Sequence, residues 1–185
     1  MIEDSNQINL AKEPAEPESE DHDVMPEVSA YAISGASHPQ TFRVMGKLKN
    51  KPVTVLIDGS STHNFIDQAV VTKYGLPVLQ NKRFQVTVAN QEQIECKGLC
   101  QALTISIQGK SITADFFVLP VAACHLILGV QWLETIGPIE MDYKQLTMTY
   151  KVGEETYTFQ GLKHTPLAAL SDKEFNSIQG SGFPF

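Results

Sequence analysis

Short segments in which apolar and polar residues alternate, each ended by a polar or glycine-containing turn, fill most of the chain after residue 28. Phe84, Val86 and Val88 alternate with polar neighbours, for example, and Ile94 resumes the pattern after the polar tip 90–93. A period of two places successive side chains on opposite faces of a strand, so this pattern predicts strands joined by hairpins. A chain with many short strands and few helical patterns is expected to fold as a compact, all-β barrel.

A few segments depart from the strand pattern. Apolar residues recur at helical spacing in residues 65–74 and 130–136, and a glycine followed shortly by a proline ends each segment, which predicts two short helices. Three further elements are predicted near the C-terminus: strands over 140–150 and 155–159, and a short helix over 171–178 that begins with a capping box.

The formal net charge of −7 is concentrated at the start of the chain. Residues 1–27 contain nine acidic residues and one basic residue, which leaves a charge of +1 for residues 28–185. The acidic segment has almost no large apolar side chains, so we expect a disordered linker there. We therefore expect one folded domain over 28–160 and a C-terminal linker over 161–185. The acidic balance argues against direct binding of nucleic acid.

The sequence also limits the compartment. Residues 1–5 lack the basic and apolar regions of a secretory signal. The longest apolar run, 114–124, contains Asp115 and Pro120, so we expect no membrane span. An intracellular, cytoplasmic protein is therefore expected.

The cysteine count agrees with that expectation. Cys96, Cys100 and Cys124 are an odd number of thiols without a signal peptide, which is typical of a reduced compartment. The spacing Cys96-x3-Cys100, with His125, matches no common zinc pattern. We therefore expect buried thiols, no metal site and no cofactor.

One segment has the character of a catalytic motif. The apolar run 52–57 ends at Asp58, and the small residues 59–62 follow it. An aspartate in this position often only caps the turn, by accepting hydrogen bonds from nearby backbone N–H groups. A second unit, Ile127-Leu128-Gly129 followed by a short helix, and the polar-tipped hairpin between the two favour a catalytic carboxylate.

Together these segments resemble the retropepsin family of aspartic peptidases, and more narrowly the protease region of plant gypsy-class retrotransposon polyproteins. The resemblance covers residues 29–159 and includes Thr62-His63-Asn64-Phe65-Ile66 directly after the aspartate loop. It implies a closed β-barrel with a flap hairpin and one or two short helices. It also implies a homodimer that cleaves an extended peptide or a polyprotein without a cofactor.

In this family, two carboxylates share one proton and activate a water molecule between them. This chain offers one suitable aspartate, so the resemblance implies that Asp58 of a second copy supplies the other carboxylate. The implied site residues are the catalytic Asp58; the active-site loop Gly59, Ser60, Ser61 and Thr62; the flap and substrate-binding residues Val88, Ala89, Asn90, Gln91 and Glu92; and the structural motif Ile127, Leu128 and Gly129.

The order of two loop residues departs from the family pattern, which is Asp-Ser/Thr-Gly. Gly59 cannot supply the hydroxyl that braces the loop of the second copy, and Ser60 is expected to strain the turn by about 1–2 kcal/mol. A second hypothesis is therefore a catalytically degenerate fold that serves as a dimerisation or binding module. A third is a β-barrel unrelated to proteolysis. We expect His63 and Trp132 to be structural residues.

Overall fold

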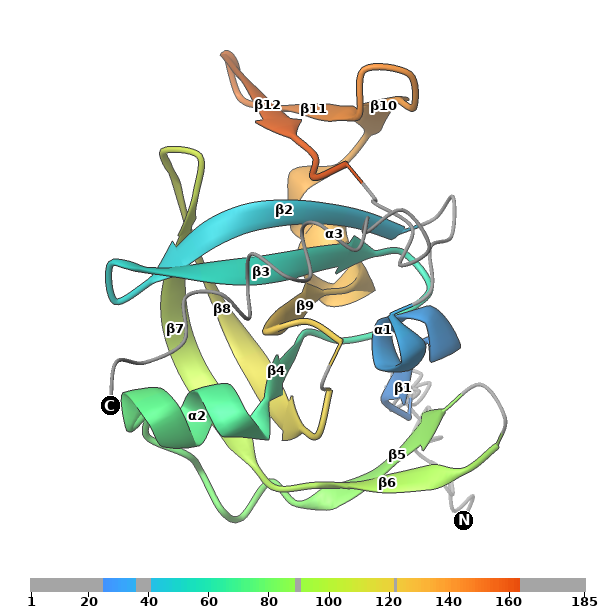
Figure 1. Cartoon of the computed structure of the whole chain (residues 1–185), viewed down its shortest axis with the longest axis vertical. Coiled ribbons are helices and arrows are strands. Elements are labelled where there is room, and N and C mark those ends of the chain that lie inside the picture. The colour runs from blue at the N-terminus through green and yellow to red at the C-terminus, as the bar shows by residue number, and fades with distance from the viewer. Residues whose placement is uncertain (1–24, 36–40, 89–90, 122, 164–185) are drawn as a thin grey trace, which may run out of the picture.

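The computed structural model describes residues 25–35, 41–88, 91–121 and 123–163, and most of them lie in short strands (Figure 1). In chain order, the elements are β1 (Glu27–Val28), α1 (Ala30–Ser34), β2 (Thr41–Leu48), β3 (Lys51–Asp58), β4 (Phe65–Asp67), α2 (Gln68–Tyr74), β5 (Phe84–Val88), β6 (Gln93–Cys96), β7 (Leu99–Ile107), β8 (Lys110–Leu119), β9 (Leu126–Leu128), α3 (Val130–Ile136), β10 (Ile139–Asp142), β11 (Thr147–Val152) and β12 (Glu155–Gln160).

Six strands close into a barrel in the order β2-β3-β9-β4-β8-β7, which confirms the predicted fold class. The hairpins β2–β3 and β7–β8 pair antiparallel along most of their length. β9 pairs parallel to β3, and β4 pairs parallel to β8. These parallel pairings bring distant segments of the chain together at the end of β3, where Asp58 lies.

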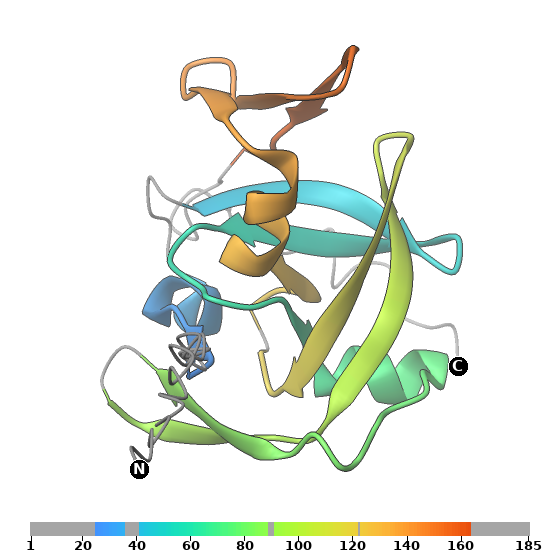
Figure 2. The same cartoon turned by 180° about the vertical axis from the view of Figure 1, so that it is seen from behind.

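Two three-stranded sheets flank the barrel (Figures 1 and 2). One consists of β1, β5 and β6, so it includes the predicted flap hairpin. The other consists of β10, β11 and β12 at the opposite end of the molecule. It packs onto the barrel core through Met148, Tyr150 and Phe159, and the Tyr150 ring meets Trp132 edge to face. Trp132 is thus a core residue, as expected.

The strand β3 is buried on both faces from Val55 to Asp58. Val55 and Ile57 point into the main core inside the barrel. Leu56 belongs to a second apolar cluster outside the barrel, beneath the β5–β6 hairpin. Because side chains alternate along a strand, Asp58 follows Leu56 on this outer face. The period of the strand therefore directs the carboxylate toward the flap side.

The predicted helix over 65–74 was wrong in its first turn. Phe65 and Ile66 are fully buried in β4, where they pair with both β8 and β9, and the helix α2 begins only at Gln68. Ladder hydrogen bonds on both sides outweigh the helical spacing of the apolar side chains. The described helices have five to seven residues, and none of them is long and apolar enough to cross a membrane.

The single strand predicted over 140–150 is also wrong, because a turn divides it into β10 and β11. The Asp142 carboxylate accepts hydrogen bonds from the backbone N–H groups of Lys144 and Gln145, at 2.9 and 2.8 Å. This side-chain capping competes with the strand ladder and starts the turn. The helix predicted over 171–178 lies outside the described residues.

We expect the substitution Asp142→Ala to lower the free energy of unfolding by about 1 kcal/mol, because two turn N–H groups lose their acceptor. Asp142→Asn keeps a side-chain oxygen at the same place and should stay close to the parent. Chemical denaturation of the three proteins provides the measurement. Equal loss in both variants would contradict this role of the Asp142 side-chain oxygen.

Candidate active site

Asp58 ends β3 and is fully buried. Its Oδ1 accepts a hydrogen bond from the backbone N–H of Ser60 at 2.9 Å. Its Oδ2 accepts one from the Ser61 hydroxyl, also at 2.9 Å, and a short one from the Ser29 hydroxyl. Hydrogen bonds to a carboxylate are stronger than those between neutral groups, so the orientation of Asp58 is fixed by three donors.

The sequence did not suggest the contact between Ser29 and Asp58. Ser29 is the N-cap residue of α1, and its Oγ also accepts a hydrogen bond from the backbone N–H of Ala32. Its backbone N–H donates to the Ser61 Oγ at 3.1 Å. A serine before a short helical stretch is the only signal in the sequence, and it indicates a cap, not a contact with Asp58.

The loop 59–62 turns without backbone strain. Ser61 N–H donates to the Asp58 carbonyl at 3.2 Å, which closes the turn. The backbone of Ser60 does not have a positive φ, so the prediction of strain at this position was wrong. A Cβ built on Gly59 would meet nothing within 4 Å. The departure from the family pattern therefore removes a hydroxyl at Gly59 without forcing a positive φ on Ser60.

The structure brings the predicted motif 127–129 directly against this loop. A Cβ on Gly129 would lie 2.3 Å from the His63 carbonyl oxygen and 2.5 Å from that of Ser61. Beyond Gly129, the backbone N–H of Val130 donates to the Ser61 carbonyl at 2.8 Å, and that of Gln131 donates to the Thr62 carbonyl at 3.0 Å. The first turn of α3 therefore supports the loop, and only glycine allows this close approach.

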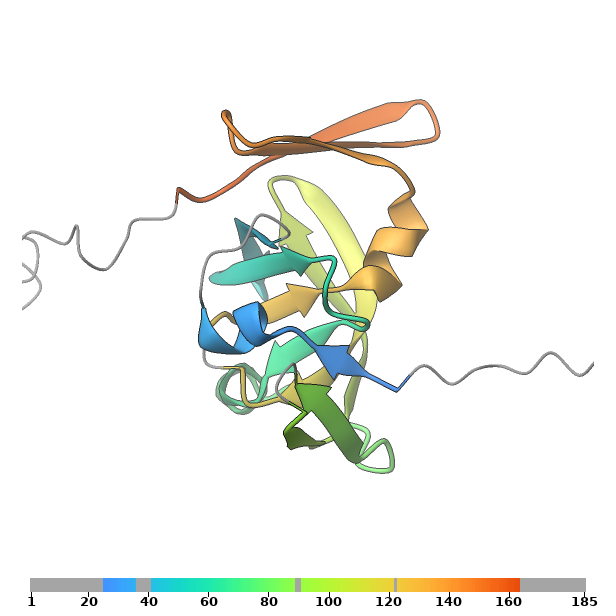
Figure 3. The same ribbon diagram turned by 90° about the vertical axis from the view of Figure 1, so that its right-hand side faces the viewer.

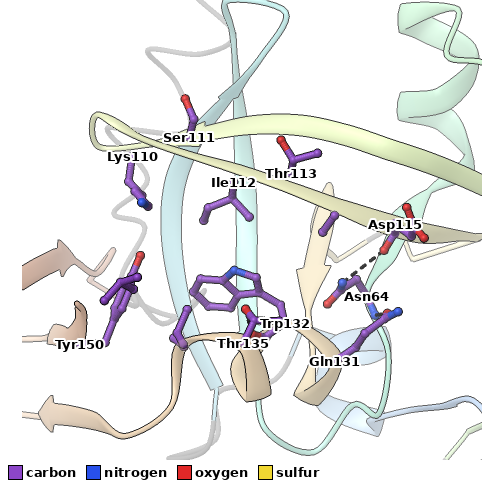
Figure 4. Close-up of a pocket in the computed structure, with 13 residues that line it drawn as sticks. Asn64, Lys110, Ser111, Ile112, Thr113, Asp115, Gln131, Trp132, Thr135 and Tyr150 are labelled. Carbon is purple, nitrogen blue, oxygen red and sulfur yellow. Dashed lines mark hydrogen bonds between the residues drawn. The ribbon is translucent and has the colours of Figure 1, made fainter. Parts of the chain in front are cut away.

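Asn64 joins the same two segments. Its Oδ1 accepts a hydrogen bond from the Gly129 N–H at 3.0 Å, and its Nδ2 donates to the Asp115 carbonyl at 3.2 Å. Figure 4 shows this second bond at the edge of a cavity of about 520 Å³ between β8, α3 and β11. Among the described residues that line the cavity, none belongs to the predicted catalytic loop or flap. Asn64 is thus a structural link between the loop after Asp58 and the start of α3.

His63 is also structural, in line with the expectation. It is half-buried, its Nδ1 lies 2.8 Å from the Thr62 hydroxyl, and its ring meets Phe117 edge to face. Burial lowers the pKa of the imidazole below its usual value, which favours the neutral form.

Three of the five predicted flap residues, Val88, Gln91 and Glu92, are described, and they lie at the end of β5 and just before β6. Val88 is buried, its N–H donates to the Glu92 carbonyl, and Gln91 N–H donates to the Val88 carbonyl, each at 2.8 Å. Gln91 has a positive φ of 64°. Ala89 and Asn90 lie outside the described residues. The two hydrogen bonds show that the chain turns tightly between Val88 and Glu92.

The three cysteines are free and buried. Burial raises the pKa of Cys100 to about 11 and that of Cys124 to about 12, and it also raises the pKa of Cys96. These thiols therefore stay protonated and unreactive at neutral pH. Within the described parts of the chain, no three His, Cys, Asp or Glu side chains form a group that could hold a metal ion.

Comparison with known proteins shows what the whole chain is similar to. A family model described as retroviral aspartyl protease matches residues 29–154, more than half of the chain. Among solved structures, the retroviral protease-like domain of Ddi1 from Leishmania major matches with a TM-score of 0.55 and 17% identity, over 70% of this chain and 100% of that domain. A retropepsin-like aspartic protease from Rickettsia conorii matches with a TM-score of 0.40 and 13% identity, over 55% of this chain and 76% of the other. A search of curated proteins finds no match.

We expect Gly129→Ala to destabilise the protein by about 3 kcal/mol or more, because its methyl group overlaps two backbone carbonyls that cannot move independently. Gly59→Ala is the matched control, since the added methyl group meets open space and the backbone φ there is not positive. Thermal unfolding of both variants at equal concentration measures the difference. Similar melting temperatures for the two would show that the loop does not depend on the close approach at Gly129.

Proposed function

Because this chain belongs to the retroviral aspartyl protease family, we propose that it is an aspartic endopeptidase whose catalytic group is Asp58. The observation that carries the proposal is the position of this carboxylate. It ends a buried barrel strand, it is oriented by three hydrogen-bond donors, and the glycine-containing 127–129 motif supports its loop. A capping aspartate on an ordinary turn needs none of the support from α3.

We propose that the second carboxylate comes from Asp58 of a second copy. The other aspartates of the described residues serve the backbone of their own chain: Asp67 accepts from Val121 N–H, Asp115 from Ala102 N–H, and Asp142 from its own turn. None of them lies in a loop of small residues. A two-fold homodimer brings two copies of one loop together at its axis.

The proposed reaction divides two roles between the paired carboxyl groups. Like charges at close range cannot both ionise, so the pair holds one proton. The ionised carboxylate takes a proton from water, and the water oxygen bonds to the carbonyl carbon of the peptide. The protonated carboxyl donates a hydrogen bond to the carbonyl oxygen. The carbonyl oxygen then re-forms its double bond, the C–N bond breaks, and the leaving nitrogen takes the proton that the first carboxylate received from water.

The surface beside Gly59 supports the dimer. Gly59 is exposed and lines an apolar groove of about 220 Å³ together with residues of β10 and the turn after it. Ile139 and Tyr143 on this groove are 40% and 64% exposed, although both are large apolar side chains. Exposed apolar surface next to the catalytic loop is what contact with a second copy would cover.

We propose that the substrate is an extended peptide held by the β5–β6 flap, and that it belongs to the polyprotein of a gypsy-class retrotransposon, processed inside the cell. The support is the flap hairpin, whose buried Val86 and Val88 share an apolar cluster with Leu56 of β3, and the resemblance of the segment 62–66 to that class of element. An extended peptide can add to a strand edge through its backbone, with alternate side chains entering pockets.

A second candidate function is a catalytically degenerate module that binds or dimerises. The specific observation in its favour is the absence of a hydroxyl at Gly59, where the family pattern has Ser or Thr. The experiments below separate the two candidates, because only a peptidase loses measurable cleavage when Asp58 is changed.

We expect Asp58→Asn to reduce the cleavage rate by a factor on the order of 10²–10⁴, because the shared proton and the base are lost in both subunits. The assay is peptide cleavage at mildly acid pH, with a statine-type inhibitor as a reference. Asp115→Asn is the control, since it changes the same functional group on β8, outside the loop and the groove beside Gly59, and keeps an oxygen for the Ala102 N–H. Retained cleavage by a well-folded Asp58→Asn protein would assign catalysis to another residue. Absence of cleavage in the parent would favour the degenerate module.

We expect Gly59→Ser alone to raise kcat/KM about five- to tenfold, because the new hydroxyl meets open space in one subunit and can brace the loop of the other. Gly59→Ala adds the same carbon without the hydroxyl and should leave the rate near that of the parent. Both are compared at equal dimer concentration, measured by analytical ultracentrifugation. An equal rate for Ser and Ala at residue 59 would show that the missing hydroxyl does not limit this enzyme.

A further inference from the structure

The chain places its own segment between the flap and the catalytic loop. This docked segment, residues 26–34, comprises Pro26, β1 and α1. In Figure 3, β1 runs beside the β5–β6 hairpin on one side and leads into α1 beside the barrel on the other. Its register with the flap strand is parallel, with Glu27 beside Thr87 and Val28 beside Val88.

Backbone hydrogen bonds hold this segment from both sides. The Thr87 N–H of the flap strand donates to the Pro26 carbonyl at 3.3 Å. On the other side, the Thr62 N–H donates to the Glu27 carbonyl at 2.9 Å, and the Glu27 N–H donates to the Thr62 hydroxyl at 2.7 Å. These groups of the flap and the loop are the ones that an extended peptide would use in strand addition.

The segment also covers the catalytic carboxylate. The Ser29 hydroxyl donates to Asp58 Oδ2, and Ser29 is itself 6% exposed. Asp58 has no exposed surface in this arrangement. If Asp58 is the catalytic group proposed above, neither water nor a second carboxylate reaches it while Ser29 holds this position.

Apolar contacts fix the segment beneath the flap. Val28 and Ala32 are fully buried and belong to the cluster outside the barrel, together with Val86 and Val88 of the flap strand. At the far end, the Arg43 guanidinium donates to the carbonyls of Gly35 and Ala123, at 3.3 and 3.0 Å. The segment is therefore held by its backbone in β1 and by two buried apolar side chains, one in β1 and one in α1.

We infer that residues 26–34 occupy the peptide-binding cleft of their own chain and hold the enzyme inactive, so that substrate and docked segment compete for one site. The position of the segment rests on the contacts described above. Its inhibitory effect rests on the proposed peptidase function. Release of the segment exposes Asp58 and frees Thr87 N–H and Thr62 N–H for a substrate backbone.

A disulfide can test this by locking the segment in place. Glu27 and Thr87 are register partners, and neighbouring strands lie about 4.8 Å apart, within the Cα separation of about 4.4–6.8 Å that a disulfide requires. The full-length variant Glu27→Cys/Thr87→Cys is compared oxidised and reduced. The control is Thr104→Cys/Thr113→Cys, another pair of register partners, whose hydroxyls lie 2.7 Å apart on the barrel exterior. The three natural thiols are buried.

Two readouts are needed. The first is cleavage: we expect oxidation to lower kcat/KM of the locked variant at least about tenfold, reversibly with dithiothreitol, and to leave the control unchanged. The second does not require activity. A water-soluble carbodiimide with an amine converts accessible carboxyl groups to amides, and mass spectrometry reports the modification of Asp58. The oxidised lock should protect Asp58 relative to its reduced form.

A released variant gives the opposite change. Val28→Asp places a charge at a fully buried position and should increase the labelling of Asp58, whereas Ala30→Asp places the same charge on the exposed face of α1 and should not. Equal labelling of Asp58 in the oxidised and reduced lock, or cleavage by the oxidised lock at the reduced rate, would overturn the inference. Increased labelling on release without any cleavage would instead support the docked segment and contradict the proposed peptidase.

Discussion

The loop that follows Asp58 depends on a backbone contact that leaves no room for a side chain. At Gly129, the carbonyl oxygens of Ser61 and His63 lie where a Cβ would be. This contact lets the first N–H groups of α3 reach the loop carbonyls, while the adjoining strand β9 pairs with β3. The loop is therefore held from behind by backbone groups, which do not change rotamer. Side chains add further bonds at Asn64, at Gln131 and at the hydroxyls around Asp58.

A buried carboxylate must be satisfied by donors, and the donors of Asp58 come from two different parts of the chain. Ser60 and Ser61 belong to its own loop and stay with it. Ser29 belongs to a segment that the rest of the fold holds through a few hydrogen bonds and two buried side chains. Loss of Ser29 leaves two donors in place, so the orientation of the carboxylate does not require the contact that covers it.

Most of the barrel and the central motif could be predicted from the sequence, because alternation and small-residue turns are local signals. The predictions failed where distant contacts decide. Residues 65–66 have helical spacing but become a strand, since β8 and β9 both pair with them. The turn after Asp142 depends on one side chain that accepts two N–H groups. The contact of Ser29 with Asp58 joins residues whose local patterns carry no sign of each other. No local signal reports which segment will cover a loop.

The pairing of β3 with β9 also bears on when the site can form. Leu56 pairs with Ile127, so the chain between them, which contains most of the barrel strands, forms a long loop. The ends of this loop must meet before the first hydrogen bond between β3 and β9 forms. During synthesis, Asp58 leaves the ribosome long before Gly129 does. The nascent chain therefore contains the proposed catalytic aspartate without its support from α3. Assembly of this site is a late event in folding. A nascent chain that ends before residue 131 contains the loop after Asp58 without the backbone hydrogen bonds from Val130 and Gln131.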